Sequence, residues 1–288
     1  MAIKPEKMQN ILLPTDFSRN AFHALRYATG LLKNRECTFF LLNAYGVEKG
    51  FKGKSVGKGN QKRSDDLKEK SNARLNNMLG KIRKENKNQK HGYSLLSEPD
   101  DLIRAVNSLI DELNIDMMVL GNKGEQSSIP VFLGSTTTDT LESVKKCPVL
   151  TVPNNAKFTV PKEIALASDF KKSYDASVLL SVRTMANLCG AALRIVHIDE
   201  EEKLDDHQKF NLDSLLTFFG PLAHSVERIP NFISKTKIIQ LFLEKSDIDM
   251  LCMVGYEHGL LEKMLREPVI ENMVLKIDIP FFIVPETP

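Results

Sequence analysis

Short, continuous apolar runs alternate with amphipathic stretches in the first half of the chain. The runs lie at residues 11–13, 39–42, 117–120 and 149–152, and such runs are typical of parallel strands covered on both faces. Apolar residues at helical spacing predict helices over residues 18–34, 64–85, 99–113 and about 135–146. Ser18 can cap the first helix and Pro99 can open the third. The alternation predicts an open, mostly parallel α/β sheet with helices on both faces.

The same order returns after a short polar stretch at residues 153–156. Apolar runs recur at residues 164–167, 193–196, 250–254 and 281–284. Local sequences also repeat in order: residues 15–17 match 168–170, residues 115–117 match 248–250, and the Val-Pro pair at 152–153 returns at 284–285. An internal duplication explains these matches. We therefore expect two domains, at residues 1–154 and 155–288.

A glycine-rich pattern follows the fourth apolar run. Its members are Gly121, Lys123 and Gly124, then, after nine residues, Gly134, Ser135 and Thr136. Glycines let backbone amides approach a phosphate closely, and a helix start adds unpaired amides and partial positive charge. The pattern indicates a bound nucleotide. The alternatives are ordinary loop glycines, a solvated loop lysine at 123 and a plain helix start at Ser135.

Asp16 lies at the end of the first predicted strand. Ligands of open parallel sheets collect at the carboxyl ends of the strands, and Asp16 and Gly121 both occupy such ends. Asp16 is therefore a candidate ligand-binding residue. Capping of the first helix is the alternative, and the two uses are compatible.

Taken together, three motifs resemble those of the universal stress protein family. They are the segment 14–18 after the first strand, the Gly-x-x-Gly loop with its distant Gly-Ser, and closing strands that end in Val-Pro. The resemblance covers nearly the whole chain as two tandem copies. It implies an open, five-stranded parallel sheet in each copy, with the adenine-nucleotide alpha-hydrolase-like fold, and ATP or a related adenine nucleotide at the carboxyl ends of the strands.

The resemblance also implies roles for individual residues of the first copy. Asp16 would lie near the nucleoside or a nucleotide-bound Mg²⁺, Pro14 and Thr15 would form the adjacent wall, and Ala44 would contact the base through its backbone. The phosphates would be wrapped by Gly121, Gly124, Gly134, Ser135 and Thr136. Apart from the resemblance, the position and charge of Lys123 between the first two glycines make it a candidate for a further phosphate contact.

The second copy departs from this pattern. It keeps Asp169, but one extra residue separates Gly255 from Gly259, and Arg266 and Glu267 align with Gly134 and Ser135. A bulky arginine and a like-charged glutamate would exclude a phosphate. We expect that this copy does not bind ATP in the family manner and instead forms an intrachain pseudo-dimer with the first. The resemblance implies pairing of strands 149–152 and 281–284, because closing strands of the family commonly pair across a dimer interface. Coverage of these edges by loops is the alternative.

Composition and charge narrow the class of protein. Of the 288 residues 42% are apolar and 26% charged, and the net charge is +2, which gives no case for a nucleic-acid or membrane partner unless a basic patch is local. No apolar run reaches about 18 residues, so we expect a cytoplasmic protein. Widely spaced cysteines predict buried thiols, with redox or metal roles as the alternative: Cys37, Cys147, Cys189 and Cys252.

Three functions are open at this point. The first is an ATP-binding stress or regulatory protein, sensed by an unknown signalling partner and able to pair again as a homodimer. The second is slow ATP hydrolysis or self-phosphorylation, for which no general base can be named, with acceptors among residues 135–138. The third is a non-nucleotide interaction scaffold.

The glycine- and lysine-rich segment 46–63 is expected to be a mobile basic loop, either a solvated insertion or a lid over the phosphates. The histidines show no metal-ligand spacing.

Overall fold

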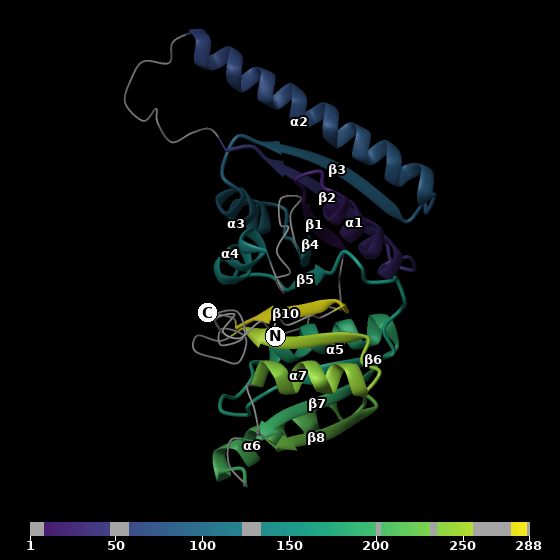
Figure 1. The fold of residues 1–288 in the computed structure, drawn as a ribbon, viewed down its shortest axis with the longest axis vertical. Coiled ribbons are helices and arrows are strands. Elements are labelled where there is room, and N and C mark those ends of the chain that lie inside the picture. The colour runs from purple at the N-terminus through teal and green to yellow at the C-terminus, as the bar shows by residue number, and fades with distance from the viewer. Residues whose placement is uncertain are drawn as a thin grey trace.

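The computed structural model has a single ten-stranded sheet flanked by helices (Figure 1). It describes residues 9–46, 58–122, 134–199, 203–230, 235–255 and 278–286. The elements of the first half are β1 (Asn10–Pro14), α1 (Arg19–Leu31), β2 (Cys37–Ala44), α2 (Lys58–Glu85), β3 (His91–Glu98), α3 (Leu102–Glu112), β4 (Met117–Gly121), α4 (Ser135–Ser143) and β5 (Val149–Val152). Those of the second half are β6 (Glu163–Ala167), α5 (Ala176–Cys189), β7 (Ala192–Asp199), α6 (Asp206–Phe219), β8 (His224–Pro230), α7 (Lys235–Lys245), β9 (Met250–Gly255) and β10 (Phe281–Pro285).

The strand order shows that the two halves share one topology. It runs β3-β2-β1-β4-β5-β10-β9-β6-β7-β8, so each half contributes five strands in the same relative order. Within each half all neighbouring strands are parallel, whereas β5 and β10 pair antiparallel through Phe281–Thr151, Phe282–Leu150 and Ile283–Val149. The predicted fold class and the predicted pairing of the closing strands are both confirmed.

The likeness between the two halves extends to fine backbone detail. Phe17 and Phe170 both have positive φ, at 66° and 54°, in the loop after the first strand of each half. Asp116 accepts hydrogen bonds from the backbone N–H groups of residues 9 and 10, and Asp249 does the same for residues 162 and 163. These pairs occupy matching positions, so the two halves are built by the same local interactions.

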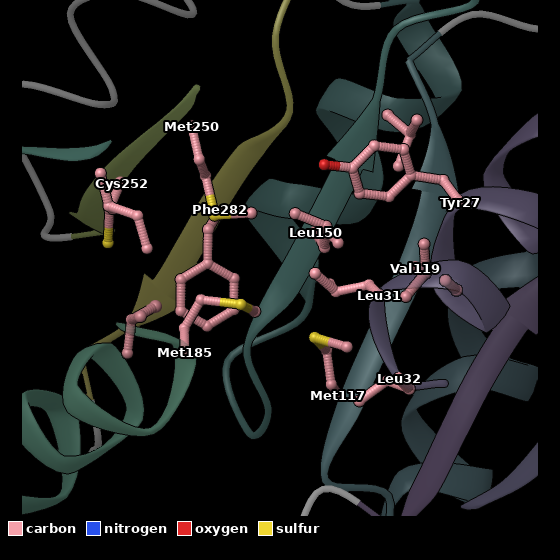
Figure 2. Close-up of a cluster of buried hydrophobic side chains, with 14 of the residues drawn as sticks. Tyr27, Leu31, Leu32, Met117, Val119, Leu150, Met185, Met250, Cys252 and Phe282 are labelled. Atoms are coloured by element: carbon pink, nitrogen blue, oxygen red, sulfur yellow. The ribbon is translucent and has the colours of Figure 1, made fainter. Parts of the chain in front are cut away.

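The apolar core lies on both faces of the sheet and crosses the junction between the halves. Helices α1, α2, α5 and α6 cover one face, and α3, α4 and α7 cover the other. Figure 2 shows Leu150 and Phe282 where the halves meet, flanked by side chains of both: Tyr27, Leu31, Leu32, Met117 and Val119 on one side, and Met185, Met250 and Cys252 on the other. Burial of apolar surface is the main driving force of folding. The apolar core shared at the junction therefore stabilises the association of the two halves.

Several predicted boundaries change. α2 begins at Lys58, so residues 58–63 belong to a helix and not to the expected basic loop, whose residues 47–57 lie outside the described residues. α3 begins at Leu102 and not at Pro99, because Asp101 caps it by accepting a hydrogen bond from the N–H of Arg104. Ser18 caps α1 as predicted, accepting from the N–H of Ala21 at 3.1 Å. α4 ends at Ser143, a few residues earlier than expected.

The cysteines are free, and three of the four are buried. Burial raises the pKa of Cys37 to about 11 and the pKa of Cys147 to about 12. The thiol of Cys189, which is partly exposed, also has its pKa raised to about 12 by burial. A thiol with a raised pKa is a poor nucleophile at neutral pH. The prediction of buried thiols is confirmed for Cys37, Cys147 and Cys252.

In the part of the chain that the structure describes, no helix has the length and apolar character needed to span a bilayer.

A buried histidine should make stability depend on pH. The His91 Nε2 donates to the Leu32 carbonyl at 3.1 Å, and burial lowers the pKa of His91. Because the unfolded chain then binds the extra proton more readily, this stability is present above about pH 6.5 and is lost as pH falls toward the lower folded pKa. We expect the urea midpoint to fall more steeply between about pH 7 and 5 in the wild type than in His91→Gln. Parallel curves for the two proteins would contradict this role.

Candidate functional site

A cavity of about 770 Å³ opens at the carboxyl ends of β1, β2 and β4 in the first half. The strand ends supply residues 14–18, 43–45 and 120–121, and α4 supplies Thr136 and Thr137. The facing wall comes from α2, through Leu67, Lys70, Ser71, Ala73 and Arg74. A cavity of this size, with mixed apolar and charged walls, can hold a small organic ligand.

The loop that carries Asp16 is held by a set of short hydrogen bonds. The Thr15 N–H donates to the Leu42 carbonyl at 2.7 Å, and the Phe17 N–H donates to Thr15 Oγ1 at 2.9 Å. Asp16 Oδ1 accepts from the Ser18 N–H at 2.9 Å. Ser18, and not Asp16, is therefore the N-cap of α1, and Asp16 braces the turn before it.

Gly121 ends β4 beside Asn20, in the first turn of α1. A Cβ at this position would lie 3.0 Å from the Asn20 carbonyl carbon and 3.1 Å from its oxygen. The Thr137 hydroxyl donates to the Gly121 carbonyl at 3.2 Å and joins α4 to the same strand end. Close packing of α1 on β4 thus favours glycine here, in addition to any demand from a ligand.

Replacing Gly121 by alanine should therefore destabilise the protein. Because the neighbouring atoms are backbone, α1 must shift, and we expect a loss of about 1–3 kcal/mol in the free energy of unfolding. Gly80→Ala is the matched control: a Cβ there meets nothing within 4 Å, and alanine in a helix interior should add about 0.5–1 kcal/mol. Urea denaturation measures both. Equal effects of the two substitutions would show that the Asn20 contact is unimportant.

The start of α4 forms the opposite wall of the cavity from α2. Gly134 is its N-cap, with φ −69° and ψ 155°, and makes no side-chain capping hydrogen bond. The Gly134 N–H donates to the Asn122 carbonyl at 2.7 Å, which places the helix start beside the end of β4. Backbone N–H groups in the first turn of a helix lack intrahelical partners and attract anions. This arrangement fits the phosphate groups of a nucleotide.

The structure brings six of the ten predicted site residues into the cavity wall: Pro14, Thr15, Asp16, Ala44, Gly121 and Thr136. Gly134 and Ser135 directly precede Thr136, whereas Lys123 and Gly124 lie outside the described residues. The α2 wall was missed. Leu67 is an apolar residue of the helix predicted over 64–85, and residues three, four and seven positions later share its helix face. Lys70, Ser71 and Arg74 could therefore have been found by this spacing.

The second half repeats the aspartate loop but places side chains against it. The Ser168 N–H donates to the Val196 carbonyl at 3.0 Å, as Thr15 does to Leu42. From α6, Gln208 Nε2 donates to the Asp169 carbonyl at 2.9 Å and Asn211 Nδ2 donates to the Phe170 carbonyl at 2.8 Å. Helix α6 therefore lies directly on this loop, whereas α2 leaves a cavity. Residues 256–259, Arg266 and Glu267 lie outside the described residues.

Solved structures share the fold over nearly the full chain. A universal stress protein from Archaeoglobus fulgidus superposes with TM-score 0.70 at 18% identity, over 97% of this chain and 99% of that one. A functionally unknown protein from Pseudomonas aeruginosa gives TM-score 0.59 at 13% identity, over 98% and 94%. The cytoplasmic domain of a prokaryotic cation chloride cotransporter gives 0.53 at 11%, over 97% and 96%. At these identities the likeness shows the fold alone.

Sequence similarity gives the family. No curated protein matches the chain significantly. The sequence model of the universal stress protein family matches residues 7–153, which is 147 of the 288 residues and thus more than half of the chain. The match includes β1 to β5 and the whole cavity described above. This protein belongs to the universal stress protein family.

Proposed function

We propose that the protein is an ATP-binding regulator of a stress response, with one nucleotide site in a domain at residues 1–154. The observation that carries the proposal is the cavity at the strand ends, with the uncapped start of α4 on one wall. The resemblance to the universal stress protein family makes ATP the expected ligand. The backbone N–H groups at the start of α4 are suitable donors for it, because amides at a helix start bind phosphate oxygens.

The proposed residue roles come from the family resemblance, and the cavity lining supports those of Pro14, Thr15, Asp16, Ala44, Gly121 and Thr136. Gly121, Gly134, Ser135 and Thr136 are proposed to hold the phosphates, together with Lys123 and Gly124, which lie between them in the sequence. Pro14 and Thr15 form the wall beside Asp16, and the backbone of Ala44 meets the base. Asp16 is proposed to bind the nucleoside or the Mg²⁺ carried with the nucleotide. Such a Mg²⁺ would supply positive charge to the phosphates, and Asp16 offers it a carboxylate, a ligand type that Mg²⁺ prefers.

The second half is proposed to bind no nucleotide. Contacts of Gln208 and Asn211 with the Asp169–Phe170 backbone support this, because they bring α6 onto the loop whose counterpart lines the cavity in the first half. Its role is then structural, as the fixed partner of the first half across β5 and β10.

Two measurements test the proposal. Nucleotide extracted from the purified protein is identified by chromatography, and ATP is titrated into nucleotide-free protein by calorimetry. We expect an adenine nucleotide and a stoichiometry of one per chain. Absence of bound nucleotide together with no binding of ATP would refute the site and leave an interaction scaffold. Incubation of the same sample with labelled ATP then reports ADP release or phosphate incorporation, which separates a binding protein from a slow enzyme.

A further inference from the structure

Arg74 has a distinctive position on the α2 wall of the cavity. Its guanidinium carbon lies over the Phe17 ring, 4.1 Å from the ring centroid, which is within the range of a cation–π contact. Phe17 and Arg74 both line the 770 Å³ cavity, and both also line a smaller hollow of about 190 Å³ beside it, with Phe22, Asn77, Met78 and Lys81. The Phe17–Arg74 pair thus forms the partition between the two spaces.

The phosphate end of the cavity lies away from this pair. α4, where the phosphates are proposed to bind, packs on one face of the sheet, whereas α1 and α2 pack on the other. A nucleotide with its phosphates at α4 therefore extends its base across the strand ends toward α2. The wall there has apolar parts at Ala44, Leu67 and Ala73, which suit the flat, weakly polar surface of a base.

We propose that Arg74, stacked on Phe17, is the platform on which the base of the bound nucleotide stacks. This inference rests on the proposed nucleotide site. A guanidinium is planar and stacks on rings through either face, so the face turned away from Phe17 can receive the base. Phe17 fixes the plane of the guanidinium before the ligand arrives, which lowers the ordering cost of binding.

Among the described residues, the second half shows no such platform at its matching loop. Phe170, which corresponds to Phe17, is fully buried and stacks on His197 with centroids 4.7 Å apart. Its ring is thus covered by a strand residue of its own half, not by an arginine of the facing helix. The Phe17–Arg74 pair is a feature of the half that has the cavity, as expected for a ligand-binding role.

The test compares two ligands and two variants. ATP and inorganic tripolyphosphate, which has no base, are titrated into the wild type, Arg74→Lys and the control Lys84→Gln by calorimetry. Arg74 and Lys84 are both exposed on α2, and Lys84 is not in the cavity wall. Because lysine keeps the charge but loses the plane, we expect Arg74→Lys to weaken ATP binding about 5- to 30-fold and to leave tripolyphosphate binding unchanged. Lys84→Gln should change neither affinity.

Other outcomes overturn the inference in distinguishable ways. Wild-type affinity for ATP in Arg74→Lys would mean that the base does not stack on the guanidinium. An equal loss for ATP and tripolyphosphate would mean that Arg74 contacts the phosphates instead. Failure of the wild type itself to bind ATP would refute the proposed function, and this inference with it. Thermal midpoints of the variants, expected to match that of the wild type, exclude unfolding as the cause.

Discussion

The Gly134→Asp variant is expected to lose ATP binding while it keeps its fold. Gly134 has φ −69° and ψ 155°, a conformation open to any residue. An aspartate at a helix N-cap accepts hydrogen bonds from the first-turn N–H groups, which are the donors proposed for the phosphates. The negative charge of the aspartate also repels the phosphates, and at a separation of about 4 Å this repulsion is worth about 4 kcal/mol in a partly exposed site. We therefore expect affinity to fall about 1,000-fold in a calorimetric titration.

Gly134→Asn is the matched control for this substitution. Asparagine has nearly the same shape and caps a helix as well as aspartate does, but it carries no charge. It should compete for the same N–H groups and cost only about tenfold in affinity. Both variants should unfold at or slightly above the wild-type denaturant midpoint, because each adds a helix cap. Unchanged ATP affinity in Gly134→Asp would place the phosphates elsewhere.

The largest loss of stability is expected for Phe282→Ala at the junction of the halves. Phe282 is fully buried in β10, opposite Leu150 of β5. Truncation removes the ring from a core that both halves share (Figure 2). Losses of this kind combine the transfer free energy with a cavity term and amount to about 3–5 kcal/mol.

Phe210→Ala gives the comparison for this truncation. The Phe210 side chain on α6 is 67% exposed, so the same chemical change there should shift the free energy of unfolding by less than about 0.5 kcal/mol. Urea denaturation followed by circular dichroism measures both variants. A small effect of Phe282→Ala would show that the two halves are stable without the shared core.

The sequence pattern predicts most of the fold because the inner strands are covered on both faces. The eight inner strands read as continuous apolar runs, and their repetition indicates the duplication. The pairing of β5 with β10 is expected from the family resemblance and not from this pattern. The apolar pattern does not predict β3, because this strand lies at the edge of the sheet and most of its residues are only half-buried. Polar residues interrupt its sequence, His-Gly-Tyr-Ser-Leu-Leu-Ser-Glu, so that it gives no long continuous apolar run.

The candidate site is predictable on its strand side and less so on its helix side. Asp16 and Gly121 lie at the carboxyl ends of predicted strands. In a parallel sheet all carboxyl ends of the strands lie at the same edge, so the two residues are expected to be close together. The positions of Lys70 and Arg74 depend on how α2 packs, and this helix is so polar that its inward stripe is weak. Gly121 shows a further limit: its contact with Asn20 joins segments about 100 residues apart, and local sequence does not reveal it.

The antiparallel β5–β10 pair makes the association of the two halves unimolecular. Both partner strands are on one chain, so each always meets the other at a fixed effective concentration, which for linked modules is on the order of millimolar. Two separate subunits joined by the same contact would come apart on dilution, and their stability would depend on total concentration. In this chain the junction is independent of expression level, so a cell can make the protein at low abundance without losing its assembly.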